Sequence, residues 1–220
     1  MIKRIVVIVG LGLYSSVCFG AIVGMTGAVV DGKQLKSGQD LTLDGTESDT
    51  AIMAYHESQV TLGAALAVDR LAPNFTVAGS IAKGTKVDSY LLHMDSTGHL
   101  SSDTINLKGT ATFSHAILGL IFSSSKLLST DTVLGVSGVY YWNKDEFGKP
   151  TSDRGLESSD KWKIFGNQLS FDANFTSSTA MDEVRVLTAV PEPSTYVAGA
   201  LMLVPFGVGM IRKLRANRTA

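Results

Sequence analysis

The stretch WKIFGNQLSFDANF, residues 162–175, decides the expected fold. From Gln168 onward, polar and apolar residues alternate, and this period of two is typical of a β-strand with one buried face. The apolar face would carry Leu169, Phe171, Ala173 and Phe175. Gly166-Asn167, just before the alternating run, is a two-residue turn signal of the kind that joins antiparallel strands. The stretch therefore predicts a tight hairpin with one apolar face.

The same period recurs in the chain on both sides of this hairpin. No segment between residues 22 and 189 sustains a helical period for three turns, and Gly, Ser, Asp and Asn separate the apolar runs. We therefore expect an all-β fold, an antiparallel β-sandwich of jelly-roll type. Further strands are expected at residues 51–57, 60–68, 75–81, 87–95, 105–113, 117–122, 133–142 and 183–188.

The N-terminal segment has the three parts of a secretory signal peptide. Lys3 and Arg4 precede an apolar run over residues 5–17, and small residues follow up to Ala21. We expect residues 1–21 to be the signal peptide, with cleavage after Gly20 or Ala21. Cys18 would then leave with the signal, so the mature chain could form neither a disulfide nor a thiolate metal site.

The C-terminal segment predicts a single membrane span. Residues 195–211 carry no charge, and their number lies near the lower limit of about 17 to 25 residues for a transmembrane helix. The basic tail, residues 212–220, holds four cations, which the positive-inside rule keeps in the cytoplasm. They are Arg212, Lys213, Arg215 and Arg218. The body, residues 22–189, is then expected to be an extracytoplasmic domain.

Pro191-Glu192-Pro193, followed by the apolar run and the basic tail, resembles the PEP-CTERM sorting signal of bacteria that make exopolysaccharide. The resemblance covers residues 190–220 and implies that exosortase, a membrane enzyme, recognises Pro191, Glu192 and Pro193. It also implies a transient membrane anchor at 195–211 and a stop-transfer cluster formed by the four cations. The two prolines favour an extended backbone that an enzyme can bind as a strand. Segments 87–95, 117–119, 154–157 and 182–186 resemble extracellular domains found before such tails.

The net charge of the body limits its partners. Residues 22–190 hold nineteen acidic and thirteen basic side chains, a net charge of −6. An acidic body lacks the basic surface that binds nucleic acid, so we expect no such partner. The expected partners are signal peptidase and the general secretion machinery, exosortase, the membrane and exopolysaccharide.

Residues that could carry chemistry are few. His56, His93, His99 and His115 are scattered, and no spacing among them fixes a zinc site. Residues 95–103 offer oxygen ligands for calcium, but their spacing departs from the EF-hand pattern and the same residue types form ordinary turns. No nucleophile elbow or phosphate-binding glycine loop is present. We therefore expect no catalytic residues and no cofactor, with calcium as the alternative.

An aromatic run before an acidic loop is the candidate binding site. Tyr141 and Trp142, with Asp145 and Glu146 of the loop 143–160, could stack on a sugar ring and bind its hydroxyl groups. In the competing interpretation, the rings pack into the core and the carboxylates solvate the loop.

These features predict an exported protein, first held in the membrane and then located at the cell surface or outside the cell. We expect a structural or adhesive role in an exopolysaccharide matrix or biofilm. A carbohydrate-binding module is the first alternative. A secreted polysaccharide hydrolase is the second, and it would need two carboxylates about 5 to 10 Å apart.

Overall fold

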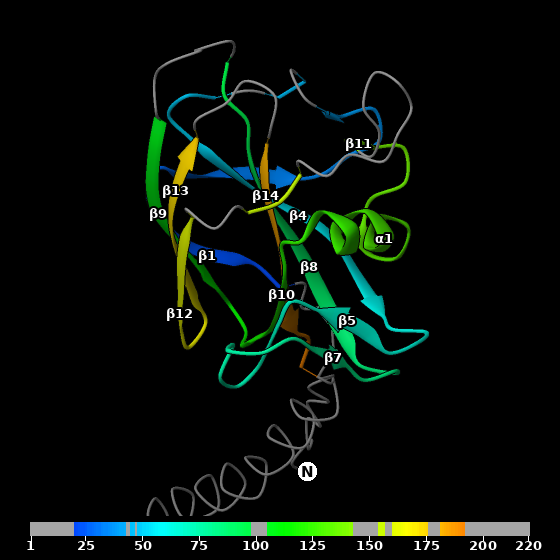
Figure 1. The fold of residues 1–220 in the computed structure, drawn as a ribbon. Coiled ribbons are helices and arrows are strands. Elements are labelled where there is room, and N and C mark those ends of the chain that lie inside the picture. Colours follow the sequence, from blue (N-terminus) through cyan, green and yellow to red (C-terminus); the bar gives the residue numbers. More distant parts are fainter. Residues whose placement is uncertain are drawn as a thin grey trace, which may run out of the picture. The chain divides into compact units, whose positions relative to one another are not determined.

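A computed structural model describes residues 20–42, 45–46, 48–97, 105–142, 154–156, 160–175 and 181–191. These residues form β-strands in several sheets and one short α-helix (Figure 1). They belong, apart from Pro191, to one compact unit, residues 19–190. The β-rich class expected from the alternation is confirmed for this part of the chain, but the expectation of an all-β body is wrong, because residues 124–134 form a helix.

The predicted hairpin lies in a four-stranded sheet. β12 (Lys161–Phe165) pairs antiparallel with β13 (Gln168–Phe175), and Phe165 lies opposite Gln168 across the turn. Gly166 has a φ of +62°, a backbone angle that glycine adopts without steric cost. β9 (Ile105–Phe113) and β1 (Ile22–Gly27) complete the sheet, in the order β1-β9-β13-β12.

The second sheet has six strands in the order β2-β4-β8-β14-β10-β6. Most neighbours are antiparallel, but β2 runs parallel to β4, so the expectation of a wholly antiparallel sheet is wrong at this edge. The strands are β2 (Val29–Gln34), β4 (Ile52–Thr61), β8 (Lys86–Met94), β14 (Asp182–Ala189), β10 (Ile117–Ile121) and β6 (Arg70–Leu71).

The two sheets share one hydrophobic core. Leu169, Phe171 and Ala173 of the predicted apolar face are buried in it, next to alternate residues of β8 and β14. The second face of β8 and β14 is also buried, because α1 (Ser124–Leu134) and loops cover it (Figure 1). In Figure 1, β9, β12 and β13 lie at the left, β8 and β14 in the middle, and α1 at the right.

The segment expected to be a strand at residues 133–142 is mostly not one. α1 ends at Leu134, and only Tyr140–Tyr141 forms a strand, β11, which pairs parallel with β3 (Asp40–Leu41). A further two-stranded sheet joins β5 (Leu66–Val68) to β7 (Gly79–Ile81).

A residue distant in sequence stabilises the start of α1. The carboxylate of Asp69 accepts hydrogen bonds from the backbone amides of Phe122 and Ser123, both at 2.8 Å, and forms an ion pair with Lys126. Unpaired amides at a helix N-terminus favour such an acceptor. Because Asp69 lies more than fifty residues before α1, sequence patterns near the helix do not reveal this cap.

No helix in the described ranges is long and apolar enough to cross a membrane. The predicted signal peptide up to Phe19 and the predicted span 195–211 lie outside these ranges.

Candidate functional site

Within the described residues, the largest group of interacting ionisable side chains lies between α1 and the outer face of the six-stranded sheet. It joins β4, β8, β14, α1 and the short segment 154–156. We call it the charge cluster, and its members are Glu57, His93, Asp131, Arg154, Glu183 and Arg185.

Arg185 is at one end of the charge cluster and is fully buried. Its Nε and Nη2 atoms donate to the two carboxylate oxygens of Glu57, both at 2.7 Å, a bidentate arrangement. Nη2 also donates to Asp131 at 2.9 Å, and Nη1 to the hydroxyl of Thr130 at 2.7 Å. Burial lowers the pKa of Arg185, but the charges of Glu57 and Asp131 outweigh it and the pKa is raised.

Arg154 is at the other end and is also fully buried. Nη1 and Nη2 donate to the two oxygens of Asp131 at 2.5 and 3.1 Å, and Nε donates to Glu183. Asp131 of α1 therefore lies between the two guanidinium groups. Because Arg154 belongs to a segment outside any strand or helix, these bonds hold that segment against the sheet.

His93 completes the charge cluster on β8. Nδ1 lies 2.9 Å from the carboxylate of Glu183, and Nε2 lies 3.0 Å from the carbonyl oxygen of Thr46. Both ring nitrogens therefore lie within hydrogen-bond distance of an acceptor oxygen. The charge cluster contains two guanidinium groups, three carboxylates and this imidazole.

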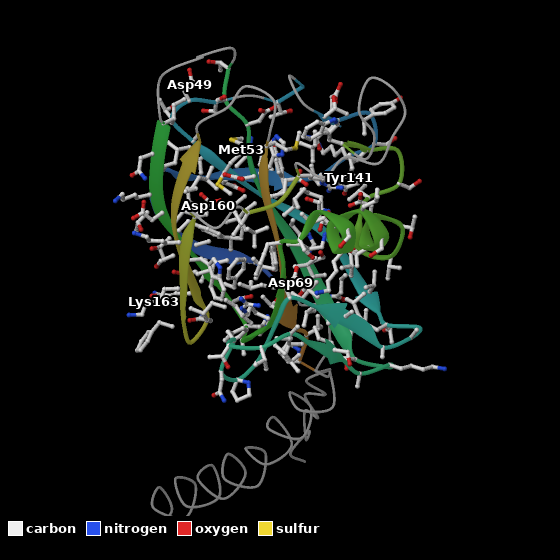
Figure 2. All side chains as sticks on the ribbon, viewed as in Figure 1. Asp49, Met53, Asp69, Tyr141, Asp160 and Lys163 are labelled. Carbon is white, nitrogen blue, oxygen red and sulfur yellow. The ribbon has the colours of Figure 1, made fainter. Side chains whose placement is uncertain are left out.

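Tyr141 covers the two arginines. Its hydroxyl donates to Glu57 at 3.0 Å and accepts from the amide of Val136 at 2.9 Å. The guanidinium carbons of Arg154 and Arg185 lie 5.3 and 5.9 Å from the centre of its ring, within cation–π range. Burial, followed by the charge of Glu57, raises the pKa of Tyr141. Figure 2 shows Tyr141 beside α1.

The geometry of the charge cluster indicates a structural role. Burial raises the pKa of Glu183, but the charge of Arg154 and the contact with His93 lower it to about 2, so the carboxylate is ionised at neutral pH. Each carboxylate is engaged by a guanidinium group. The charge cluster joins α1 and the segment 154–156 to three central strands.

The residues of the predicted sugar-binding site are only partly described. Tyr141 and Trp142 are buried, with 7% and 8% of their surface exposed, whereas the preceding Tyr140 is 63% exposed. Tyr141 is thus engaged in the charge cluster. Asp145 and Glu146 lie outside the described residues.

The sorting and metal predictions fall mostly outside the described ranges. Of the sorting motif, Pro191 alone is described, and the four stop-transfer cations are not. Where side chains are described, no group of three His, Cys, Asp or Glu residues could hold a metal ion. In the candidate calcium segment, Thr97 donates to Asp49, whose pKa is lowered by this hydrogen bonding.

An open groove of about 540 Å³ is a second candidate site. It lies between the edge strand β12, the start of β10 and residues 72–75 after β6. Its lining includes the aromatic residues Trp162 and Phe75 and the polar residues Asn74 and Lys163. The guanidinium of Arg70 lies 5.8 Å from the ring of Trp162. Lys163 is labelled on β12 in Figure 2.

Sequence reasoning missed both sites. The charge cluster had one signal: Glu183 and Arg185, of opposite charge, alternate with valines within one predicted strand. Alternation alone assigns them to a polar face of that strand, and α1 and Arg154 cover this face. The groove had no signal, because it forms where three segments distant in sequence meet.

Comparisons with known proteins add no family to this description. No family model matches the chain, and neither a curated protein nor a solved structure matches it significantly.

Proposed function

We propose that this chain is an exported protein that exosortase sorts and that serves a structural or adhesive role in an exopolysaccharide matrix. One observation supports the proposal above the others. β1 begins at Ile22 and β14 ends at Ala189, so the described strands fill the interval between the two predicted sorting segments. A folded body of this extent is a suitable cargo for export and display.

The body is proposed to be a jelly-roll-like β-sandwich. The shared core between the four- and six-stranded sheets supports this interpretation. A sandwich without cysteine must be stable outside the cell by burial and pairing alone, since residues 20–191 contain no thiol. The charge cluster suits that requirement, because it joins a helix and a loop segment to the sheet through buried ion pairs.

The sorting part of the proposal is tested with Glu192, the one charge between the two prolines. The wild type and Glu192→Ala are expressed in a host with exosortase, and intact masses are measured in the envelope and the medium. We expect the wild type to lose both ends and Glu192→Ala to keep its C-terminal segment and remain in the membrane. Asp31→Ala, at an exposed carboxylate of β2, is the matched control and should behave like the wild type. Identical masses and locations for wild type and Glu192→Ala would refute sorting.

Carbohydrate binding is the second candidate, and the groove favours it. A half-buried indole in a groove that Asn74 also lines matches the apolar face and hydroxyl edge of a sugar. We therefore assign the candidate sugar contact to Trp162 instead of the buried Trp142.

The binding test compares two aromatic residues of β12. Trp162 lines the groove, whereas Phe165 is 79% exposed and does not line it. We expect Trp162→Ala to weaken binding to the host exopolysaccharide at least tenfold and Phe165→Ala to leave it within twofold. Equal affinities of both variants and the wild type would exclude the groove as the sugar site.

A further inference from the structure

A second buried carboxylate, away from the charge cluster, lies where the body begins. Asp88 of β8 is fully buried on the inner face of the six-stranded sheet. Gln59 Nε2 donates to its Oδ1 at 3.0 Å, and the backbone amide of Gly20 donates to its Oδ2 at 2.9 Å. Both donors are neutral, so they satisfy hydrogen bonds of the carboxylate but not its charge.

The carboxylate is nevertheless ionised. Burial raises the pKa of Asp88, but His56, Gln59 and Gly20 together lower it below its ordinary value. Of the described basic side chains, His56 alone lies within 4.0 Å, with Nε2 at 3.5 Å from Oδ1. A buried anion with no closer cation is costly, so the site favours a further positive charge.

Two further hydroxyl groups lie near Asp88 and Gly20. The hydroxyl of Tyr90 is buried and lies 2.5 Å from the position where a side chain at Gly20 would begin, so it faces Gly20. Burial and the charge of Asp88 raise the pKa of Tyr90, and hydrogen bonding with Thr188, the residue opposite Asp88 on β14, lowers it in part. Cross-strand partners share a face of the sheet.

This environment matches an α-ammonium group better than an amide. An amide nitrogen offers one hydrogen, whereas an ammonium offers three hydrogens and a unit positive charge. One N–H can remain on Asp88 and another can bond to Tyr90. Gly20 lies at the expected end of the signal peptide, where cleavage would create such a group.

We propose that signal-peptide cleavage at the bond before Gly20, one residue earlier than the sequence pattern predicts, leaves an α-ammonium on Gly20 that forms a buried ion pair with Asp88. This inference rests on the proposed export of the chain. Hydrolysis of that bond consumes one water molecule, and the new amine takes up a proton at neutral pH. The precursor lacks this cation, so processing stabilises the folded body and binds its N-terminus to β8.

The test measures the reactivity of the α-amine in mature protein recovered from the envelope or the medium. N-terminal sequencing identifies the first residue, and acylation by a neutral reagent at pH 7.5 gives the rate at the α-amine, with lysine side chains as the internal reference. Since acylation needs the unprotonated amine, we expect the wild type to react at least tenfold more slowly than Asp88→Asn. Asp31→Asn, at an exposed carboxylate, should match the wild type.

If Asp88→Asn does not accumulate, Tyr90→Phe replaces it, because the variant removes only the hydroxyl. We expect a two- to fivefold faster reaction for this variant. A first residue of Gly20 with a protected amine supports the inference. A first residue of Ala21 or Ile22, or an amine equally reactive in all variants, overturns the inference but leaves export intact. Retention of Met1 overturns export as well.

Discussion

Replacing Arg185 by methionine tests whether the charge cluster stabilises the fold. Arg185→Met keeps the length of the side chain but removes the donors of the bidentate pair with Glu57 and of the bond to Asp131. Removal of one partner from a buried ion pair costs about 3 to 5 kcal/mol, because the remaining charge stays buried. A domain with a total stability of about 5 to 15 kcal/mol would lose a large part of it.

The matched control is Lys108→Met. Lys108 pairs with Asp172 at 2.9 Å on the surface of the four-stranded sheet, where its side chain is 64% exposed. Exposed pairs contribute about 0 to 1 kcal/mol, so this variant should remain close to the wild type. Urea unfolding of the mature protein at pH 7, followed by tryptophan fluorescence, gives each free energy of unfolding.

A double variant separates the ion pair from the packing of its side chains. Glu57→Leu with Arg185→Met removes both charges, and such replacements are often close to neutral. We expect the double variant to be more stable than Arg185→Met alone. Arg185→Met would refute this reasoning if it lowered the free energy of unfolding by less than about 1 kcal/mol, as Lys108→Met is expected to do. A buried charge left without its partner should destabilise the protein by more than this.

Three further predictions follow from individual contacts. Burial raises the pKa of Glu183, but the charge of Arg154 lowers this pKa to about 2, below the ordinary value of 4.5. Its stabilising contribution is therefore complete above about pH 4.5 and is lost as the pH falls toward 2, by on the order of 3 kcal/mol. Urea midpoints between pH 6 and 3 check this loss, and Glu183→Gln should not show it. Gly27→Ala should destabilise the protein more than Gly166→Ala. Both glycines have a positive φ, so the backbone strain is similar. A Cβ at Gly27 would lie 2.8 Å from a backbone carbon of β9, whereas a Cβ at Gly166 would enter open space. Thermal melts compare the two, and equal melting temperatures would contradict the predicted clash. Asp69→Ala should destabilise the protein by about 1 to 2 kcal/mol by removing the cap of α1. Chemical denaturation measures the effect, and an unchanged midpoint would argue against that cap.

The sequence by itself determined the strands that alternate cleanly. The hairpin β12–β13, the apolar face of β13, and strands β8, β9, β10 and β14 follow from local patterns. A period of two and a Gly-Asn turn depend on neighbouring residues alone, so a single sequence contains them. The sorting segments at both ends are likewise local patterns, and they remain predictions.

Only the tertiary structure decided what covers the outer face of the six-stranded sheet. Period-two alternation assigns Glu183 and Arg185 to a polar face, but it does not say whether water or protein contacts that face. α1 and Arg154 contact it, so both residues are buried and paired. The tertiary structure likewise decided the cap of α1 by Asp69 and the groove at Trp162. Each depends on contacts between residues far apart in the chain, which local periodicity does not encode.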